Sequence, residues 1–205
     1  MYVPDRYRET DPELIRAFIA RHPFGTLVTT AEGGPRATHL PLRLEREGER
    51  DVIVGHLAKA NPQWQDFDGG RIALAMFAWG PHAYVSPRWY GEGRYVPTWN
   101  YASVHLRGAP EVITDASEHR DAIRRLTEQF EDRAGYSMDD LPEDYLGTML
   151  EATVAFRMPV DELDAAFKLN QNRTPDARQG VIAELEQSED SAARWIADLM
   201  RERLD

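Results

Sequence analysis

Polar side chains that could hold an anion gather near the ends of two neighbouring predicted strands and in the loop that follows them. They are Arg36, Thr38, His39, His56, Lys59 and Asn61. Ammonium and guanidinium groups, together with hydroxyl and amide donors, are the groups that proteins use to bind phosphate and carboxylate. The set therefore predicts an anion pocket, although each residue taken singly is more typical of a structural role.

A second concentration of chemically useful residues runs from position 84 to position 101. It holds two of the five tryptophans and four of the eight tyrosines, with glycines at 91 and 93 between its halves. Such a stretch can be a hairpin that packs its rings into a core, or the wall of a pocket for a flat ring. An aromatic wall combined with an anion pocket suits a ligand with a phosphate at one end and a ring at the other. Flavin mononucleotide (FMN) is such a ligand.

The common catalytic signatures are absent from the sequence. It has no GxGxxG after a strand, no Walker loop, no HExxH and no GxSxG. The six histidines lack the spacing of metal ligands, and the absence of cysteine excludes disulfides and thiol chemistry. We therefore predict no metal site, and the sequence identifies no catalytic residue.

Composition and charge narrow the class of protein. With 205 residues, 42% apolar and 29% charged, the chain is long enough to bury a core of its own. A net charge of −11 argues against direct electrostatic binding of nucleic acid. No apolar run is long enough to span a bilayer, and the first residues do not resemble a secretory signal. We expect a cytoplasmic protein without a membrane partner.

The elements that must position these residues are mainly short strands. Apolar and β-branched runs separated by tight turns predict an antiparallel barrel rather than a parallel βαβ sheet. The predicted strands cover residues 24–30, 35–44, 51–56, 72–77, 103–108, 110–113 and 153–158, and the aromatic stretch adds a hairpin.

Helices are predicted at both ends of the chain and after residue 114. Thr10 and Glu13 form a possible capping box for a helix over 11–21 in which Leu14, Ile15, Phe18 and Ile19 share a face. Ser117 is the predicted cap of a helix with Ile123, Leu126 and Phe130 on one face, and a less regular helix follows over 141–150. Thr174 and Pro175 begin a helix to about residue 187, and a last helix presents Trp195, Ile196, Leu199 and Met200. We expect one α+β domain over 1–205, with 174–205 as a helical extension.

Several longer motifs, in order, resemble the PaiB family, whose members are described as FMN-binding negative transcriptional regulators. The motifs are Tyr2-Val3-Pro4, Phe24-Gly25-Thr26-Leu27, Thr38-His39-Leu40-Pro41, the run from Gly55 to Trp64, the run from Gly80 to Pro87, Val96 to Tyr101, Val104-His105 with Gly108, and Phe167 to Arg173. The similarity extends to about residue 185. The chain departs from the family at Asn170, where serine is usual, and at Ala165-Ala166, where an acidic residue and a glycine are usual.

The resemblance implies a split β-barrel of the flavin-reductase and pyridoxamine-phosphate-oxidase type, with FMN at the interface of a homodimer. It implies that Arg36 to His39 and His56 to Asn61 hold the phosphate, with Lys59 as the main contact. It also implies that a partner subunit supplies aromatic and polar side chains to the flavin. The candidates for that role are Trp99, Asn100, Lys168, Gln171 and Asn172.

Three functions remain open from the sequence. The family implies a flavin-dependent negative regulator of transcription, although no helix-turn-helix signature or basic stripe points to DNA and a regulatory protein could be the partner. An FMN-dependent oxidoreductase or flavin reductase acting on a small acceptor is the first alternative. Haem binding or breakdown is the second, with His39, His56, His82 or His105 as possible iron ligands.

Overall fold

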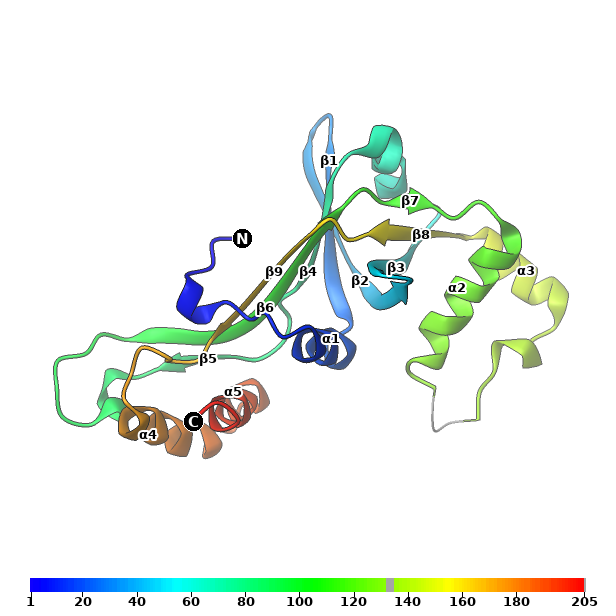
Figure 1. Cartoon of the computed structure of the whole chain (residues 1–205). Helices are drawn as coiled ribbons and strands as arrows, with labels where there is room; N and C mark the ends of the chain where they lie inside the picture. The colour runs from blue at the N-terminus through cyan, green and yellow to red at the C-terminus, as the bar shows by residue number, and fades with distance from the viewer. Residues whose placement is uncertain (132–134, 205) are drawn as a thin grey trace. The chain divides into compact units, whose positions relative to one another are not determined.

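The computed structural model describes residues 1–131 and 135–204 and divides into two compact units (Figure 1). Unit 1 comprises Met1–Ile15, Ala78–His105 and Asp164–Asp205, and unit 2 comprises Arg16–Phe77 and Leu106–Leu163. Each unit is therefore assembled from separate stretches of the chain. No helix in the described residues has the length and apolar composition needed to cross a membrane.

Unit 2 is built on an antiparallel sheet, as the run of short strands predicts. Its neighbouring strands, in spatial order, are β4 (Ala73–Phe77), β1 (Phe24–Ala31), β2 (Gly34–Glu47), β3 (Arg50–Ala58), β8 (Thr153–Pro159) and β7 (Glu111–Val112). The β1–β2 register pairs Thr29 with Arg36 and Leu27 with Thr38. Because side chains opposite each other in an antiparallel pair lie on the same face, this register fixes the surroundings of the predicted anion-binding residues.

The two faces of the unit 2 sheet carry different layers. On one face Gly55 pairs with Leu42 and Phe156, and a Cβ at Gly55 would lie 2.8 Å from each of these side chains. The Phe156 ring meets Phe67 edge-on at 5.2 Å. On the other face the helix α2 (Ala116–Glu128) covers a buried cluster made of Val52, Val54, Ile113, Ala122, Leu126 and Ala155. Alternation along the strands thus separates the α2 side from the face that carries Arg36 and Thr38.

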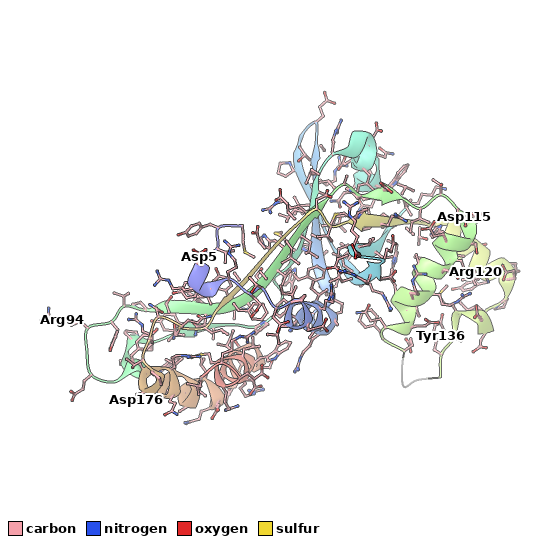
Figure 2. All side chains as sticks on the ribbon, in the orientation of Figure 1. Asp5, Arg94, Asp115, Arg120, Tyr136 and Asp176 are labelled. Atoms are coloured by element: carbon pink, nitrogen blue, oxygen red, sulfur yellow. The ribbon has the colours of Figure 1, made fainter. Side chains whose placement is uncertain are left out.

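The start of α2 corrects one sequence prediction. Asp115, not Ser117, caps the helix, because its carboxylate accepts a hydrogen bond of 2.9 Å from the Glu118 backbone N–H. Figure 2 shows Asp115 at this end of α2. The predicted helical face is also too long, since Phe130 lies beyond the end of α2 and is exposed.

Helix α3 (Glu143–Glu151) follows the short 3₁₀ turn η4 (Met138–Asp140) and is linked to α2 by an exposed ion pair. Arg120 donates two hydrogen bonds to the Glu143 carboxylate, at 2.9 and 2.6 Å. The hydrogen bond from Arg120 is the main cause that lowers the pKa of Glu143 below its usual value. Exposed ion pairs of this kind contribute little to the free energy of unfolding, so this pair helps to orient α3 without adding much stability.

Helix α1 (Pro12–Arg21) forms where its apolar period predicts it, but its cap is a different residue. The Asp11 carboxylate accepts from the Glu13 N–H at 2.9 Å and from the Leu14 N–H at 3.4 Å, so Asp11 rather than Thr10 occupies the capping position. Of the four residues on the predicted apolar face, Ile15, Phe18 and Ile19 are buried and Leu14 is exposed.

Unit 1 contains the aromatic stretch as a β-hairpin. Strand β5 (His82–Val85) pairs antiparallel with β6 (Thr98–Gly108), which places Tyr84 opposite Trp99, and β6 also pairs with β9 (Glu162–Lys168). A 3₁₀ turn, η3 (Pro87–Tyr90), follows β5, and Gly91 and Gly93 then take positive φ angles of 82° and 144°. Glycine adopts such angles without strain, so the pair provides the reversal that the sequence indicates.

The loop between β5 and β6 is held by an arginine from the turn between β9 and α4. The Arg173 guanidinium lies 4.8 Å from the ring centre of Tyr90 and 4.9 Å from that of Tyr95. A guanidinium between two aromatic faces gains cation–π attraction and covers apolar surface with its stem. Part of the aromatic stretch is therefore structural, as the hairpin alternative predicts.

Helices α4 (Pro175–Glu186) and α5 (Ser191–Arg201) complete unit 1 and lie side by side (Figure 1). Thr174 caps α4 as predicted, accepting from the Ala177 N–H at 3.4 Å. The buried Arg178 side chain reaches the end of α5, where it donates to the carbonyls of Met200, at 3.3 Å, and Arg203. A cation at a helix C-terminus satisfies carbonyls that the helix itself leaves without partners.

His22, just after α1, provides a pH-dependent contribution to stability. Burial, followed by the nearby Arg21 charge, lowers the pKa of His22 to about 4. Because the unfolded chain then binds a proton more readily than the folded one, stability is fully present above about pH 6.5 and falls as the pH drops towards 4. We expect His22→Gln to flatten the decrease in the free energy of unfolding between pH 7.5 and 4.5, measured by urea titration. His82→Gln, at an exposed histidine, should leave the decrease in place.

Candidate functional site

Three of the predicted anion-binding residues meet in unit 2, on the face of β1 and β2 that is away from α2. The side chains of Arg36 and Thr38 lie on this face because they are two positions apart in β2. Asn61 joins them from the loop after β3, where its amide donates to the Thr38 hydroxyl at 2.9 Å. The hydroxyl proton of Thr38 remains available to a ligand, since a hydroxyl that accepts one bond can still donate one.

Gln63, which the sequence prediction did not include, fastens this loop to the sheet. Asn61 caps the 3₁₀ segment η2 (Pro62–Gly70) by accepting from the Gln63 N–H at 3.0 Å. The Gln63 side chain is fully buried, and its amide donates to the carbonyls of Leu27 and Arg36 and to the Thr29 hydroxyl at 3.0 to 3.1 Å. One side chain thus connects η2 to both β1 and β2.

Asp66 holds Arg36 in place and changes its expected role. The Asp66 carboxylate accepts from the Thr29 hydroxyl at 2.7 Å and from one Arg36 nitrogen at 3.0 and 3.1 Å. The Asp66 side chain is 10% exposed and that of Arg36 is 38% exposed. Arg36 therefore already has an internal counter-ion, so it can offer an anion only those N–H groups that Asp66 does not use. We call Thr29, Arg36, Thr38, Lys59, Asn61, Gln63 and Asp66 the anion cluster.

Lys59 combines a fixed backbone with an ammonium group that has no partner in the part of the chain that the structure describes. Its N–H donates to the Ala152 carbonyl at 2.8 Å, and its carbonyl accepts from the Trp64 indole at 3.1 Å. The side chain is exposed. An anchored backbone with an unpaired cation is suited to binding an anion, because only the side chain loses conformational entropy when the anion binds.

The two histidines of the predicted pocket lie elsewhere in unit 2. His39 lies on the opposite face of β2 from Arg36 and Thr38, and its ring is 2.9 Å from the Thr26 hydroxyl. His56 follows Val52 and Val54 on the face covered by α2. Burial, followed by the charge of His119, lowers the pKa of His56 and favours the neutral ring. The described contacts bring neither histidine to the anion cluster.

Five further candidates belong to unit 1, and two of them sit next to each other on β6. Trp99 is 54% exposed and contacts the Tyr84 ring edge-on at 5.9 Å between ring centres. Asn100 is fully buried, and its amide donates to the Met200 sulfur at 3.3 Å. In the described chain Trp99 therefore presents a free aromatic face, whereas Asn100 makes an internal packing contact.

The remaining three candidates lie at the last residue of β9 and in the turn that follows it. The Lys168 ammonium lies 2.6 Å from the Thr98 hydroxyl, and burial lowers the pKa of Lys168. Gln171 folds back on the backbone, accepting from the Leu169 N–H at 2.8 Å and donating to the Phe167 carbonyl at 2.5 Å. Asn172 is exposed, with its amide oxygen 3.5 Å from the Tyr7 hydroxyl.

The turn after β9 explains the family departure at position 170. Asn170 is the described non-glycine residue with a positive φ, at 60°. Asparagine enters this left-handed region more readily than serine does. The substitution therefore suits the backbone of the turn, and the buried side chain need not contact a ligand.

The residues present fit the phosphate end of FMN. Lys59 supplies a positive charge that no described residue pairs with, Thr38 supplies a hydroxyl donor, and Arg36 offers its unused N–H groups at a partly exposed position. The one buried carboxylate of the cluster, Asp66, is already neutralised by Arg36. A bound phosphate would therefore meet donors rather than an uncompensated negative charge.

A family profile with the description "Putative FMN-binding domain" matches residues 1–162. The chain is also 37% identical, over its whole length and 98% of the relative, to "Protease synthase and sporulation protein PAI 2" of Bacillus subtilis (strain 168). The chain belongs to the PaiB family of FMN-binding proteins. This PaiB-family chain is also 27% identical, over 99% of the chain and 97% of the relative, to "Uncharacterized protein AN0679" of Emericella nidulans.

Solved structures support the predicted fold of this PaiB-family chain. The FAD and haem binding protein from Mycobacterium smegmatis superimposes with a TM-score of 0.58 at 20% identity, covering 79% of this chain and 73% of that one. The flavocytochrome Anf3 from Azotobacter vinelandii superimposes with a TM-score of 0.59 at 17% identity, covering 78% of this chain and 69% of that one. These structures confirm the α+β split-barrel class with an antiparallel sheet and flanking helices. The family and FMN as cofactor are confirmed by the family profile and the Bacillus subtilis relative. The individual site residues stay predictions.

Proposed function

We propose that this PaiB-family chain binds FMN with the phosphate at the anion cluster and acts as a flavin-dependent negative regulator of transcription. The observation that carries the first half is Lys59, which has an anchored backbone and an ammonium group with no partner among the described residues. Lys59 comes two residues before Asn61, whose amide donates to the Thr38 hydroxyl. The regulatory half is supported by the likeness to the sporulation-related Bacillus subtilis protein. The proposed setting is the cytoplasm.

The regulator is proposed to act through a protein partner rather than by binding DNA directly. A chain with a net charge of −11 repels the phosphate backbone unless its positive charge is segregated. Most of that positive charge is arginine, and many of these arginines pair with carboxylates in the described residues, such as Arg16 with Asp51 and Arg125 with Glu45. Neither lysine makes an ion pair within residues 1–131 and 135–204.

A homodimer is part of the proposal, with the second subunit completing the flavin site. Trp99 and Tyr84 expose aromatic surface in unit 1, at 54% and 46%, which suits either a ring or a partner subunit. Sedimentation of the protein with and without FMN tests this point, and a monomer in both conditions would contradict it.

The FMN proposal predicts that Lys59→Ala weakens FMN binding about tenfold without unfolding the protein, because a charge-assisted contact to phosphate is lost. The measurement is a titration of flavin fluorescence, read alongside the absorption spectrum of the purified protein. Arg94→Ala is the matched control: it also removes one positive charge, from an exposed loop of unit 1 (Figure 2). Equal FMN affinity in the two variants would move the phosphate site elsewhere.

The same preparation separates the proposed regulator from the other two functions. Oxidation of reduced nicotinamide coupled to an added acceptor would support an FMN-dependent oxidoreductase instead. A Soret band in the purified protein would support haem binding. A salt-dependent shift of a DNA fragment would contradict action through a protein partner alone.

A further inference from the structure

Unit 1 contains an open groove of about 480 Å³ that shares no residue with the anion cluster. Its lining comes from β5, β6, η3, α4, α5 and the turn between α4 and α5. Buried apolar side chains, Ala83, Leu185 and Ala193, form its base. The base is therefore apolar, while the specificity of the groove depends on the side chains around it.

One side of the groove is aromatic. Tyr84, Trp89, Trp99 and the imidazole of His82 all line it. The Trp99 ring is 5.9 Å from Tyr84 and 6.1 Å from His82, centre to centre. Trp99 and Tyr84 keep about half of their surface exposed, so their faces are accessible to a ligand. Aromatic faces carry negative charge density and attract cations that lie against them.

Acidic groups line the other side. Glu184, near the end of α4, is exposed, and Asp190 begins α5, where one of its oxygens accepts from the Ala192 N–H at 2.8 Å. No lysine or arginine lines the groove among the described residues, although Arg194 donates to the carbonyl of the lining residue Ser188 at 2.6 Å. Two carboxylates against this one guanidinium leave the groove negative.

We propose that this groove binds an organic ammonium ion, a ligand with alkyl groups on a positively charged nitrogen. The aromatic side and the carboxylates both favour a cation, and the apolar base favours one that carries carbon rather than a hydrated metal ion. Phosphate and other anions are disfavoured by Glu184 and Asp190. The inference does not rest on the proposed phosphate site, because the groove and the anion cluster share no residue. It requires that the second subunit of the proposed homodimer leaves the faces of Trp99 and Tyr84 accessible.

The test compares choline with 3,3-dimethyl-1-butanol, a neutral molecule of nearly the same shape. Isothermal titration and tryptophan fluorescence should show saturable binding of choline and at least about tenfold weaker binding of the alcohol. Glu184→Gln and Trp99→Leu should each weaken choline binding several-fold. Glu32→Gln removes the same charge from an exposed turn of unit 2 and should not change the affinity.

Four results would overturn the inference. They are equal binding of choline and the alcohol, no saturable choline binding, an unchanged affinity in both groove variants, and loss of choline binding when FMN is added. The last result would show that the flavin ring occupies the groove. Choline binding in a protein that fails to bind FMN would instead contradict the proposed function and leave this inference standing. Circular dichroism of Trp99→Leu excludes unfolding as the cause of a loss.

Discussion

Gly180→Ala is expected to destabilise the protein by about 2 kcal/mol, although glycine to alanine normally stabilises a helix. Gly180 lies within α4, where α4 passes against η3 so closely that a Cβ at this position would collide with the Trp89 carbonyl oxygen. That oxygen belongs to the backbone and cannot rotate away as a flexible side chain can. The methyl group must therefore push α4 away from η3. Urea unfolding followed by tryptophan fluorescence measures the loss.

The control is Gly147→Ala, the same chemical change within α3. Nothing lies within 4 Å of a Cβ built at Gly147, so the substitution should add about 1 kcal/mol from helix propensity alone. Two identical substitutions in helices should thus change stability with opposite signs. If both raised the free energy of unfolding, the close approach of α4 to η3 would be refuted.

Gln63→Leu should cost about 3 kcal/mol and weaken FMN binding as well. Leucine has a similar size but no donor, so the carbonyls of Leu27 and Arg36 would lose the amide that pairs with them. The link from η2 to β1 and β2 would then be broken, and the Asn61 and Lys59 positions would be held less firmly. Thermal unfolding and an FMN titration report the two effects separately.

Gln65→Leu provides the matched comparison, because Gln65 is two residues further along the same 3₁₀ segment and is exposed. It should change stability by less than about 0.5 kcal/mol and leave FMN binding unchanged. Similar losses in the two variants would mean that leucine disturbs the segment in general. The three hydrogen bonds of Gln63 would then not be the cause.

The sheet could be predicted from the sequence because its signals are local. Short β-branched runs and glycine turns predicted strands that match β1, β2, β3, β4 and β8 closely, and Thr174-Pro175 predicted the start of α4. Helix caps were harder to predict, because Thr10 and Asp11 are adjacent, Asp115 and Ser117 are two positions apart, and all four carry suitable oxygens. The backbone conformation where the chain enters the helix decides which of the two residues caps it, and the sequence does not show that conformation.

The candidate site was predictable in part. Arg36, Thr38 and Asn61 do come together. The roles of Gln63 and Asp66 depend on the packing of η2 against β1, which no local sequence pattern predicts. The side on which His56 lies follows from its register with β8, a strand almost a hundred residues later. The motifs at strand ends therefore showed which residues lie near one another along the chain. They did not show on which face of the sheet each side chain lies.

The discontinuous make-up of the units has a consequence for synthesis of the protein on the ribosome. All of unit 2 has been translated once residue 163 is made, whereas unit 1 still lacks Asp164–Asp205. Until α4 and α5 emerge, the β5–β6 hairpin has no helices to cover Ala83 and Asn100. Because domains tend to fold as units while the chain grows, unit 2 should form first. The aromatic hairpin of unit 1 should then be the part of the nascent chain most in need of protection by chaperones.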